Sequence, residues 1–119
     1  MRTAAKRDAN EPAIIEGLEA DGNLVQPLEQ GDGCPDILVL SRHTLEWVVM
    51  EIKNPAQWPS DRRLRPAQVT WFTKFNGNMS AGVGPHTVRA YKIETLAEAL
   101  ACVRLVRTNT GALAPRGEI

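Results

Sequence analysis

Cysteine is scarce in this chain, and its two cysteines, Cys34 and Cys102, lie far apart and form no CxxC pair. That spacing excludes a disulfide framework and a cysteine-based zinc motif, and it suits a reducing compartment. No apolar run approaches the ~20 residues that a membrane span needs. The polar segment Met1 to Arg7 lacks the apolar region of a signal peptide. We therefore expect a cytoplasmic protein without a membrane partner.

The chain also has no formal net charge, because fourteen basic residues balance fourteen acidic ones. A nucleic-acid partner would therefore have to be held by a local basic patch rather than by a field over the whole surface. The chain has no internal repeat, and its 119 residues fit one domain. We expect a single domain over residues 1–107, followed by a flexible C-terminal tail over 108–119.

Three segments have the apolar spacing and end signals of helices. The first spans about 8–21, where Asp8 and Glu11 suit a capping box and Gly22 suits a stop. Pro12 is tolerated only in a first turn, which moves the start toward Asn10 or Glu11. Glu11 also lies on the apolar stripe of this helix, and a charge there needs a reason.

The second helix is predicted to begin at Pro66 and to end at Gly77, with Gln68 at the head of its apolar face. The third opens with a capping box formed by Thr95 and Glu98.

Strands are predicted between these helices. The runs 37–40 and 47–50 are apolar on both faces, as in central strands, and the segment between them is short enough for a hairpin. The order helix, three strands, helix, strand, helix predicts an α/β protein with a mixed four-stranded sheet flanked by helices. A short, weak strand is predicted over 24–28 and a further strand over 88–93, and the predicted loops are 54–65 and 78–85.

The hairpin carries the chemistry. A turn centred on His43 and Thr44 places Asp36 opposite Glu51, with Cβ atoms ~4.5–5.5 Å apart. Lys53 shares their face, because alternate residues of a strand point the same way. Two carboxylates this close repel each other beside an apolar sheet, and a divalent cation such as Mg²⁺ removes the conflict. The backbone carbonyl of Ile52 is a further candidate ligand, and Lys53 can orient the attacking water or neutralise phosphate charge.

These residues resemble a known nuclease signature. Gly33-Cys34-Pro35-Asp36 followed by Glu51-Ile52-Lys53 resembles the motif of the PD-(D/E)xK superfamily, whose restriction-endonuclease-like core has the same order of elements. Within it, the chain looks like the VRR-NUC group over roughly residues 7–104. The supporting pieces are 7–11, 33–38, 51–54 and 66–68.

The resemblance implies phosphodiester hydrolysis of DNA with Mg²⁺ or Mn²⁺. It implies that Asp36 and Glu51 bind the metal and that Lys53 assists the water. Glu11 matches an acidic residue that binds or organises metal, and Gln68 matches a glutamine near the metal or the phosphate. Stand-alone members look like homodimers acting on four-way (Holliday) junctions, so a homodimer that prefers branched DNA is expected.

Plainer alternatives stay open. Glu11 can be only a cap, Gln68 only a first-turn polar residue, and Trp58 either packs or stacks on a base. A non-catalytic nucleic-acid-binding module, or a subunit of a larger restriction or repair machine, fits the same fold. The basic residues of the 54–65 segment are either ordinary surface charge or a phosphate-binding patch; they are Arg62, Arg63 and Arg65.

Overall fold

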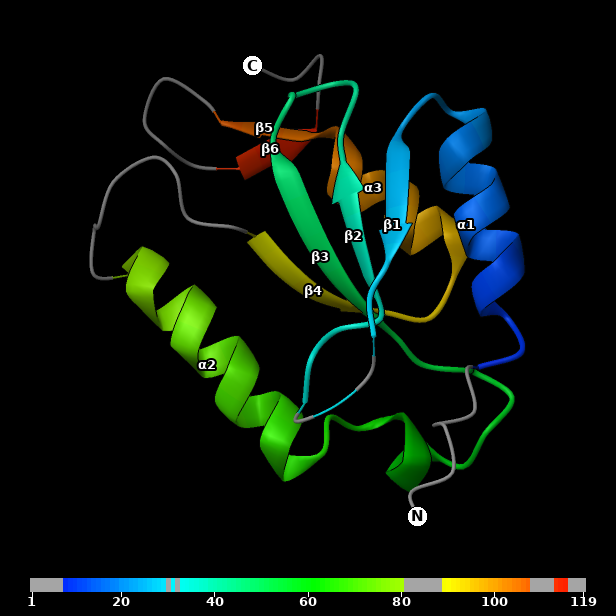
Figure 1. Cartoon of the computed structure of the whole chain (residues 1–119), viewed down its shortest axis with the longest axis vertical. Coiled ribbons are helices and arrows are strands. Elements are labelled where there is room, and N and C mark those ends of the chain that lie inside the picture. Colours follow the sequence, from blue (N-terminus) through cyan, green and yellow to red (C-terminus); the bar gives the residue numbers. More distant parts are fainter. Residues whose placement is uncertain (1–7, 30, 32, 81–88, 108–112, 116–119) are drawn as a thin grey trace.

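The computed structural model of the chain describes residues 8–29, 31, 33–80, 89–107 and 113–115. A four-stranded sheet in the order β1-β2-β3-β4 separates α1 and α3 on one face from α2 on the other (Figure 1). The predicted α/β class with a mixed four-stranded sheet is confirmed. The elements are α1 (Glu11–Ala20), β1 (Leu24–Pro27), β2 (Ile37–Leu40), β3 (Trp47–Ile52), η1 (Pro59–Arg62), α2 (Pro66–Ser80), β4 (Arg89–Ile93), α3 (Leu96–Arg104), β5 (Leu105–Arg107) and β6 (Leu113–Pro115).

The hairpin register is the one that the alternating pattern predicts. In the antiparallel pair β2–β3, Leu38 lies opposite Val49 and Leu40 opposite Trp47. β1 pairs with the other edge of β2, also antiparallel. β4 runs parallel to β3, as the helix between them predicts.

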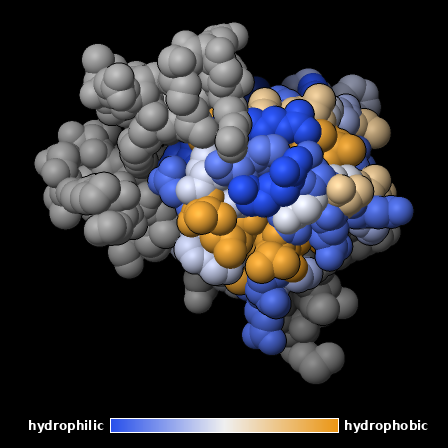
Figure 2. Space-filling view, turned by 90° about the horizontal axis from the view of Figure 1, so that it is seen from above, coloured by the Kyte–Doolittle hydropathy of each residue, from blue (hydrophilic) through white to orange (hydrophobic). Residues whose placement is uncertain are grey.

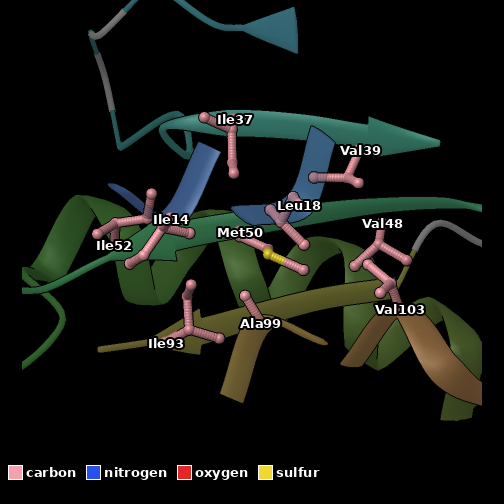
Figure 3. Packing of buried hydrophobic residues seen from close by; sticks show 10 residues of the cluster. All are labelled: Ile14, Leu18, Ile37, Val39, Val48, Met50, Ile52, Ile93, Ala99 and Val103. Carbon is pink, nitrogen blue, oxygen red and sulfur yellow. The ribbon is translucent and has the colours of Figure 1, made fainter. Parts of the chain in front are cut away.

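Each face of the sheet has its own core. The larger cluster lies between the sheet and α1 and α3, and Figure 3 shows its side chains interlocking. The smaller cluster lies under α2 and centres on Val49, Phe72 and Ala90. The larger cluster consists of Ile14, Leu18, Ile37, Val39, Val48, Met50, Ile52, Ile93, Ala99 and Val103.

One of the two predicted capping boxes is present and the other is not. Thr95 and Glu98 form the expected capping box of α3. The box predicted from Asp8 and Glu11 is wrong: α1 begins at Glu11 after Asn10, whose side chain makes no capping bond. The Asn10 amide is used instead to bridge two strand ends, which is described below.

Three predicted boundaries also need correction. α2 continues to Ser80 through Gly77, because one glycine costs a helix only ~1 kcal/mol and does not force a stop. The predicted loop 54–65 contains the short helix η1. The tail is not wholly irregular, since β6 pairs antiparallel with β5. The remaining tail residues, 108–112 and 116–119, lie outside the described residues, as do 81–85 of the predicted second loop.

Seen from above, much of the described surface is hydrophilic, and hydrophobic residues are gathered mainly near the middle of this face, with others toward its edge (Figure 2). In the described part of the chain, no helix has the length and apolar character needed to cross a membrane. The exposed large apolar side chains are Leu24, Leu45, Trp47, Trp58 and Val69.

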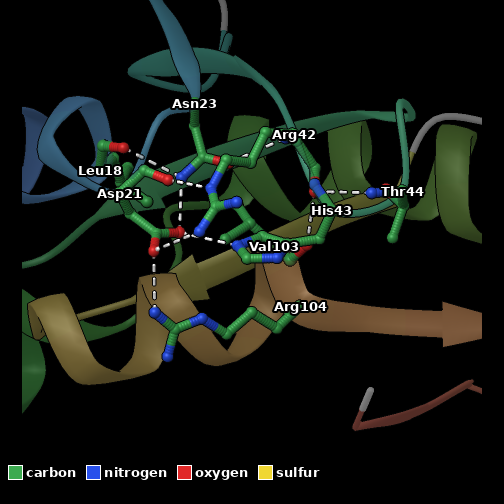
Figure 4. Close-up of polar contacts among 9 residues, drawn as sticks. Leu18, Asp21, Asn23, Arg42, His43, Thr44, Val103 and Arg104 are labelled. Atoms are coloured by element: carbon green, nitrogen blue, oxygen red, sulfur yellow. Dashed lines mark hydrogen bonds and ion pairs between the residues drawn. The ribbon is translucent and has the colours of Figure 1, made fainter. Parts of the chain in front are cut away.

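A polar cluster fixes the turn between β2 and β3 to the ends of α1 and α3 (Figure 4). The Asp21 carboxylate lies 2.8 Å from Nε2 of His43, and Arg104 donates to it over 2.9 Å. Asn23 donates to the same carboxylate over 3.2 Å. The hydrogen bond with His43 is the main reason that the pKa of Asp21 lies well below its usual range, and the hydrogen bond with Arg104 lowers it further. His43, which has no metal-ligand spacing in the sequence, therefore has a structural role.

Replacing Asp21 by Asn should lower the free energy of unfolding by about 2 kcal/mol at pH 7, because hydrogen bonds to a charged group are lost. A lowered pKa means that this contribution is complete above the ordinary carboxyl pKa of 3.8 and disappears as the pH falls further. Denaturant titrations from pH 7 to pH 2.5 should therefore show the two proteins converging at the acidic end. Glu19→Gln, an exposed change on the same helix, is the control; equal stability of Asp21→Asn and wild type at pH 7 would contradict the assignment.

Candidate active site

Three ionisable side chains meet where β3 ends. Asp36, Glu51 and Lys53 are only 4%, 4% and 5% exposed, respectively. Asp36 directly precedes β2, Glu51 lies within β3, and Lys53 directly follows it. The structure therefore brings together the three residues that the hairpin argument singled out. Buried charges are costly unless they are paired, so their neighbours define the site.

Strand alternation places Glu51 and Lys53 on the sheet face that α2 covers. Lys53 Nζ lies 3.4 Å from Glu51 Oε2 and donates to Gln68 Oε1 over 3.0 Å. Gln68 belongs to the first turn of α2, and the same oxygen accepts the backbone N–H of Arg65 over 2.8 Å. Gln68 is therefore a buried member of the site and not a solvent-facing residue of the first turn.

Asp36 closes the site from the side of β2. Its Oδ2 accepts the backbone N–H of Ile52 over 2.7 Å, while its own N–H donates to the carbonyl of Met50. The N–H and carbonyl of one strand residue leave the strand on the same edge. The Ile52 carbonyl therefore points to the edge where Asp36 lies.

The charge of Asp36 opposes the ionisation of Glu51. Burial, and then the negative charge of Asp36, raise the pKa of Glu51 to about 8, against the opposing influence of Lys53. Oε1 of Glu51 is buried and has no hydrogen-bond partner among the described residues. At neutral pH the site therefore holds a proton on Glu51 that an ordinary glutamate would have released.

A glycine allows the Asp36 loop to approach α2. Gly33 has φ +80°, and a Cβ added there would collide with the backbone carbonyl of Ala67. Only glycine combines that conformation with that contact at low cost. Gly33 thus brings the loop before Asp36 against the helix turn that carries Gln68.

The segment before α1 lies against the same end of the sheet. The Asn10 side-chain amide donates to the carbonyls of Lys53 and Glu94, over 3.1 and 2.9 Å. Burial, and then the charge of Asp36, raise the pKa of Asp8, which is therefore within electrostatic reach of the site. Neither role was predicted from the sequence, in which Asp8 fitted a helix cap and Asn10 had no assigned contact.

Glu11 is buried, as its place on the apolar stripe suggested, with 3% of its surface exposed. The charged neighbours that shift the pKa of Glu51 are Asp36 and Lys53, and Glu11 is not one of them. A role for Glu11 in holding a metal stays a prediction.

The three arginines of the predicted basic patch have different surroundings. Arg62 is ion-paired with Glu94 at 3.1 Å, and its carbonyl accepts a hydrogen bond from Lys92. Arg63 and Arg65 are exposed. Arg62 thus anchors the segment before α2, and the other two remain candidates for contacting phosphate.

Cys34 lies beside the two carboxyl groups. Burial, and then the charges of Glu51 and Asp36, raise the pKa of its thiol. The thiol is therefore neutral at physiological pH, as expected for a small packed residue and not for a nucleophile.

The oxygen atoms of this site are few, but they are of the kind that binds a hard cation. Within the described ranges, no three His, Cys, Asp or Glu side chains are grouped so that they could hold a metal ion. The oxygens that are present are two adjacent carboxylates, one with an unpartnered buried atom, and the Ile52 carbonyl on the same edge. Mg²⁺ takes one or two protein carboxylates and completes its shell with water and substrate phosphate, so these residues fit it.

Comparison of the chain with protein-family models, with curated proteins and with solved structures finds no match. The resemblance to the VRR-NUC group therefore rests on the sequence motifs quoted above and stays a prediction.

In metal-free protein, Glu51→Gln should raise the free energy of unfolding at pH 8. The folded chain retains the Glu51 proton up to a pKa of about 8, whereas the unfolded chain releases it near 4.5. Stability should therefore fall as the pH rises through this window, by up to about 1.4 kcal/mol per pH unit, and the variant should lack that slope.

Denaturant titrations in EDTA between pH 5 and pH 8.5 measure both slopes. Glu16→Gln, the same change at an exposed site on α1, should keep the wild-type slope. An unchanged slope in Glu51→Gln would show that Glu51 is already ionised in the metal-free protein.

Proposed function

We propose that this protein is a metal-dependent nuclease that hydrolyses phosphodiester bonds in DNA. The observation that carries the proposal is the buried pair Asp36 and Glu51 with Lys53 bonded beside it. A buried pair of carboxyl groups is costly to the fold unless its charge is compensated. A metal-dependent centre for phosphodiester hydrolysis makes use of close carboxylates as metal ligands and of a cationic side chain that stabilises charge on the phosphate. The resemblance to the PD-(D/E)xK signature supports the same conclusion from the order of motifs.

The side chains of Asp36 and Glu51 and the carbonyl of Ile52 would hold Mg²⁺ or Mn²⁺. When bound, such an ion neutralises phosphate charge and favours ionisation of water near neutral pH. Binding would replace the proton on Glu51, so that both carboxyl groups become ionised together. This exchange gives the raised pKa of Glu51 a functional reason.

Lys53 is the residue that acts on the substrate. In hydrolysis, the oxygen of a water molecule bonds to phosphorus, the bond to one sugar oxygen breaks, and that oxygen takes up a proton. The Lys53 ammonium group places a positive charge where negative charge develops on the phosphoryl oxygens. Gln68 holds that ammonium group through its 3.0 Å hydrogen bond, which makes Gln68 a positioning residue.

A binding module without catalysis is the second candidate. It is favoured by the absence of a third metal-ligating side chain among the described residues. It is disfavoured by the burial of Asp36, Glu51 and Lys53, because a surface that only binds DNA gains nothing from internal carboxylates.

The decisive experiment incubates purified protein with Mg²⁺ or Mn²⁺ and linear, flapped and four-way DNA. Wild type is expected to cleave, and Glu51→Gln or Asp36→Asn should lose about 100-fold or more of that rate, as when a key charge-stabilising group is removed. Glu16→Gln is the matched control. Binding of the panel without cleavage by wild type would favour the binding module.

Lys53→Ala separates the roles within the site. It should lose cleavage to a similar extent but retain Mn²⁺ binding in calorimetric titrations, because Lys53 supplies no ligand and its removal takes away a positive charge that repels the metal ion. Loss of Mn²⁺ affinity together with activity would assign the lysine to the metal site instead.

A homodimer is the proposed assembly. The described residues contain one such carboxylate centre, and cutting both strands of a branched substrate at related positions is simplest with two centres across a two-fold axis. Light scattering on a sizing column should give about twice the chain mass of 13.1 kDa. A single-chain mass together with isolated nicks would refute it.

A further inference from the structure

The segment between β3 and α2, residues 54–65, is fixed to neighbouring elements in its second half. Arg62 pairs with Glu94 at 3.1 Å, and Lys92 donates to the carbonyl of Arg62 over 3.0 Å. At its end, Arg65 N–H donates to Gln68 Oε1 over 2.8 Å. We call this segment the site loop, because it begins directly after Lys53 and ends at the helix turn that carries Gln68.

Although the site loop is fixed, its largest side chain points into solvent. Trp58 is 78% exposed, and it immediately precedes η1 with an extended backbone. Asp61 N–H donates to its carbonyl over 2.9 Å, so the backbone around it is held as well. Tryptophan is highly buried on average, and a tethered one that stays exposed points to a partner with a flat apolar surface.

The charges nearby favour a nucleic acid as that partner. Arg63 and Arg65 of the site loop are exposed cations, whereas Arg62 is occupied by Glu94 and Asp61 offsets one charge. An exposed indole in the same short segment as two exposed arginines combines a surface for base stacking with groups that can contact phosphate. A protein partner would also accept a tryptophan, but it would not account for the neighbouring cations or for the adjacent carboxylate centre.

We propose that Trp58 stacks on an unpaired base next to the phosphate at the candidate active site. Bases inside a duplex have both faces covered, so an unpaired base that can stack on Trp58 has to come from a single-stranded end, flap or branch. This inference rests on the proposed nuclease function for its substrate, but it concerns recognition and not the chemical step. It gives the preference for branched DNA a physical cause in this chain.

The test measures binding in EDTA, where cleavage plays no part. Wild type, Trp58→Ala and Trp58→Phe are titrated with labelled single-stranded, flapped and blunt duplex DNA of equal length. Trp58→Ala should weaken binding to the single-stranded and flapped DNA roughly 10-fold, as expected for loss of one stacked base, and leave the blunt duplex nearly unchanged. Trp58→Phe keeps an aromatic face and should retain most of the affinity.

Leu45→Ala is the control, because Leu45 is 77% exposed in the turn at the other end of β3. It should bind all three DNAs as wild type does. A spectroscopic readout accompanies the titration: single-stranded DNA should quench part of the tryptophan emission of wild type, and that part should be missing in Trp58→Phe. Circular dichroism melting checks that the variants are folded.

Three results would overturn the inference. Trp58→Ala could bind single-stranded DNA as tightly as wild type, it could lose the same affinity for every DNA, or wild type could bind no DNA at all. The two proposals fail separately. Selective binding through Trp58 without cleavage under any metal would remove the nuclease assignment alone. If Glu51→Gln abolishes cleavage while Trp58→Ala changes neither cleavage nor DNA binding, only the stacking assignment is removed.

Discussion

The contact between the carboxyl groups of Asp36 and Glu51 is the constraint around which this end of the molecule is built. Burial of Glu51, and then the negative charge of Asp36, raise the pKa of Glu51 to about 8. The site is therefore electrostatically unfavourable when both carboxyl groups are ionised. Lys53 and the N–H of Ile52 offset part of that cost, at 3.4 Å from Glu51 and 2.7 Å from Asp36. Natural sequences keep such local conflicts mainly at functional sites, and this is the physical basis of the assignment.

Segments that are distant in the sequence are brought to the carboxylate site by the contacts of a few residues. Asn10 reaches the carbonyl of Lys53, 43 residues away, and that of Glu94, 84 residues away. Gln68 ties Lys53 to the start of α2, and the absence of a side chain at Gly33 lets the Asp36 loop meet that helix. The geometry of the carboxylates therefore depends on three connections as well as on the hairpin, which gives a site on rigid elements.

The sequence predicted the hairpin part of the site because strand side chains alternate with a period of two. Once the turn was centred on His43 and Thr44, the pairing of Leu38 with Val49 and the shared face of Glu51 and Lys53 followed. The contacts of Asn10 and the pairing of Arg62 with Glu94 could not be predicted in this way. They join segments with no shared periodicity, and a polar residue at a helix start is equally compatible with a cap, as the failed Asp8 capping box shows.

The two ends of β3 differ in how completely their polar groups are satisfied. At the turn, the Asp21 carboxylate is bonded to His43, Arg104 and Asn23, and its pKa is lowered, as expected of a group that stabilises the fold. At the other end, a carboxyl pKa is raised and Glu51 Oε1 is buried without a partner among the described residues. Both clusters are acidic groups with cationic neighbours, so the presence of charge alone does not separate them. The direction of the pKa shift does: the lowered carboxyl pKa of Asp21 reflects interactions completed by folding, whereas the raised pKa of Glu51 reflects burial and a neighbouring negative charge that the fold leaves partly uncompensated, which is the condition that the proposed divalent cation would relieve.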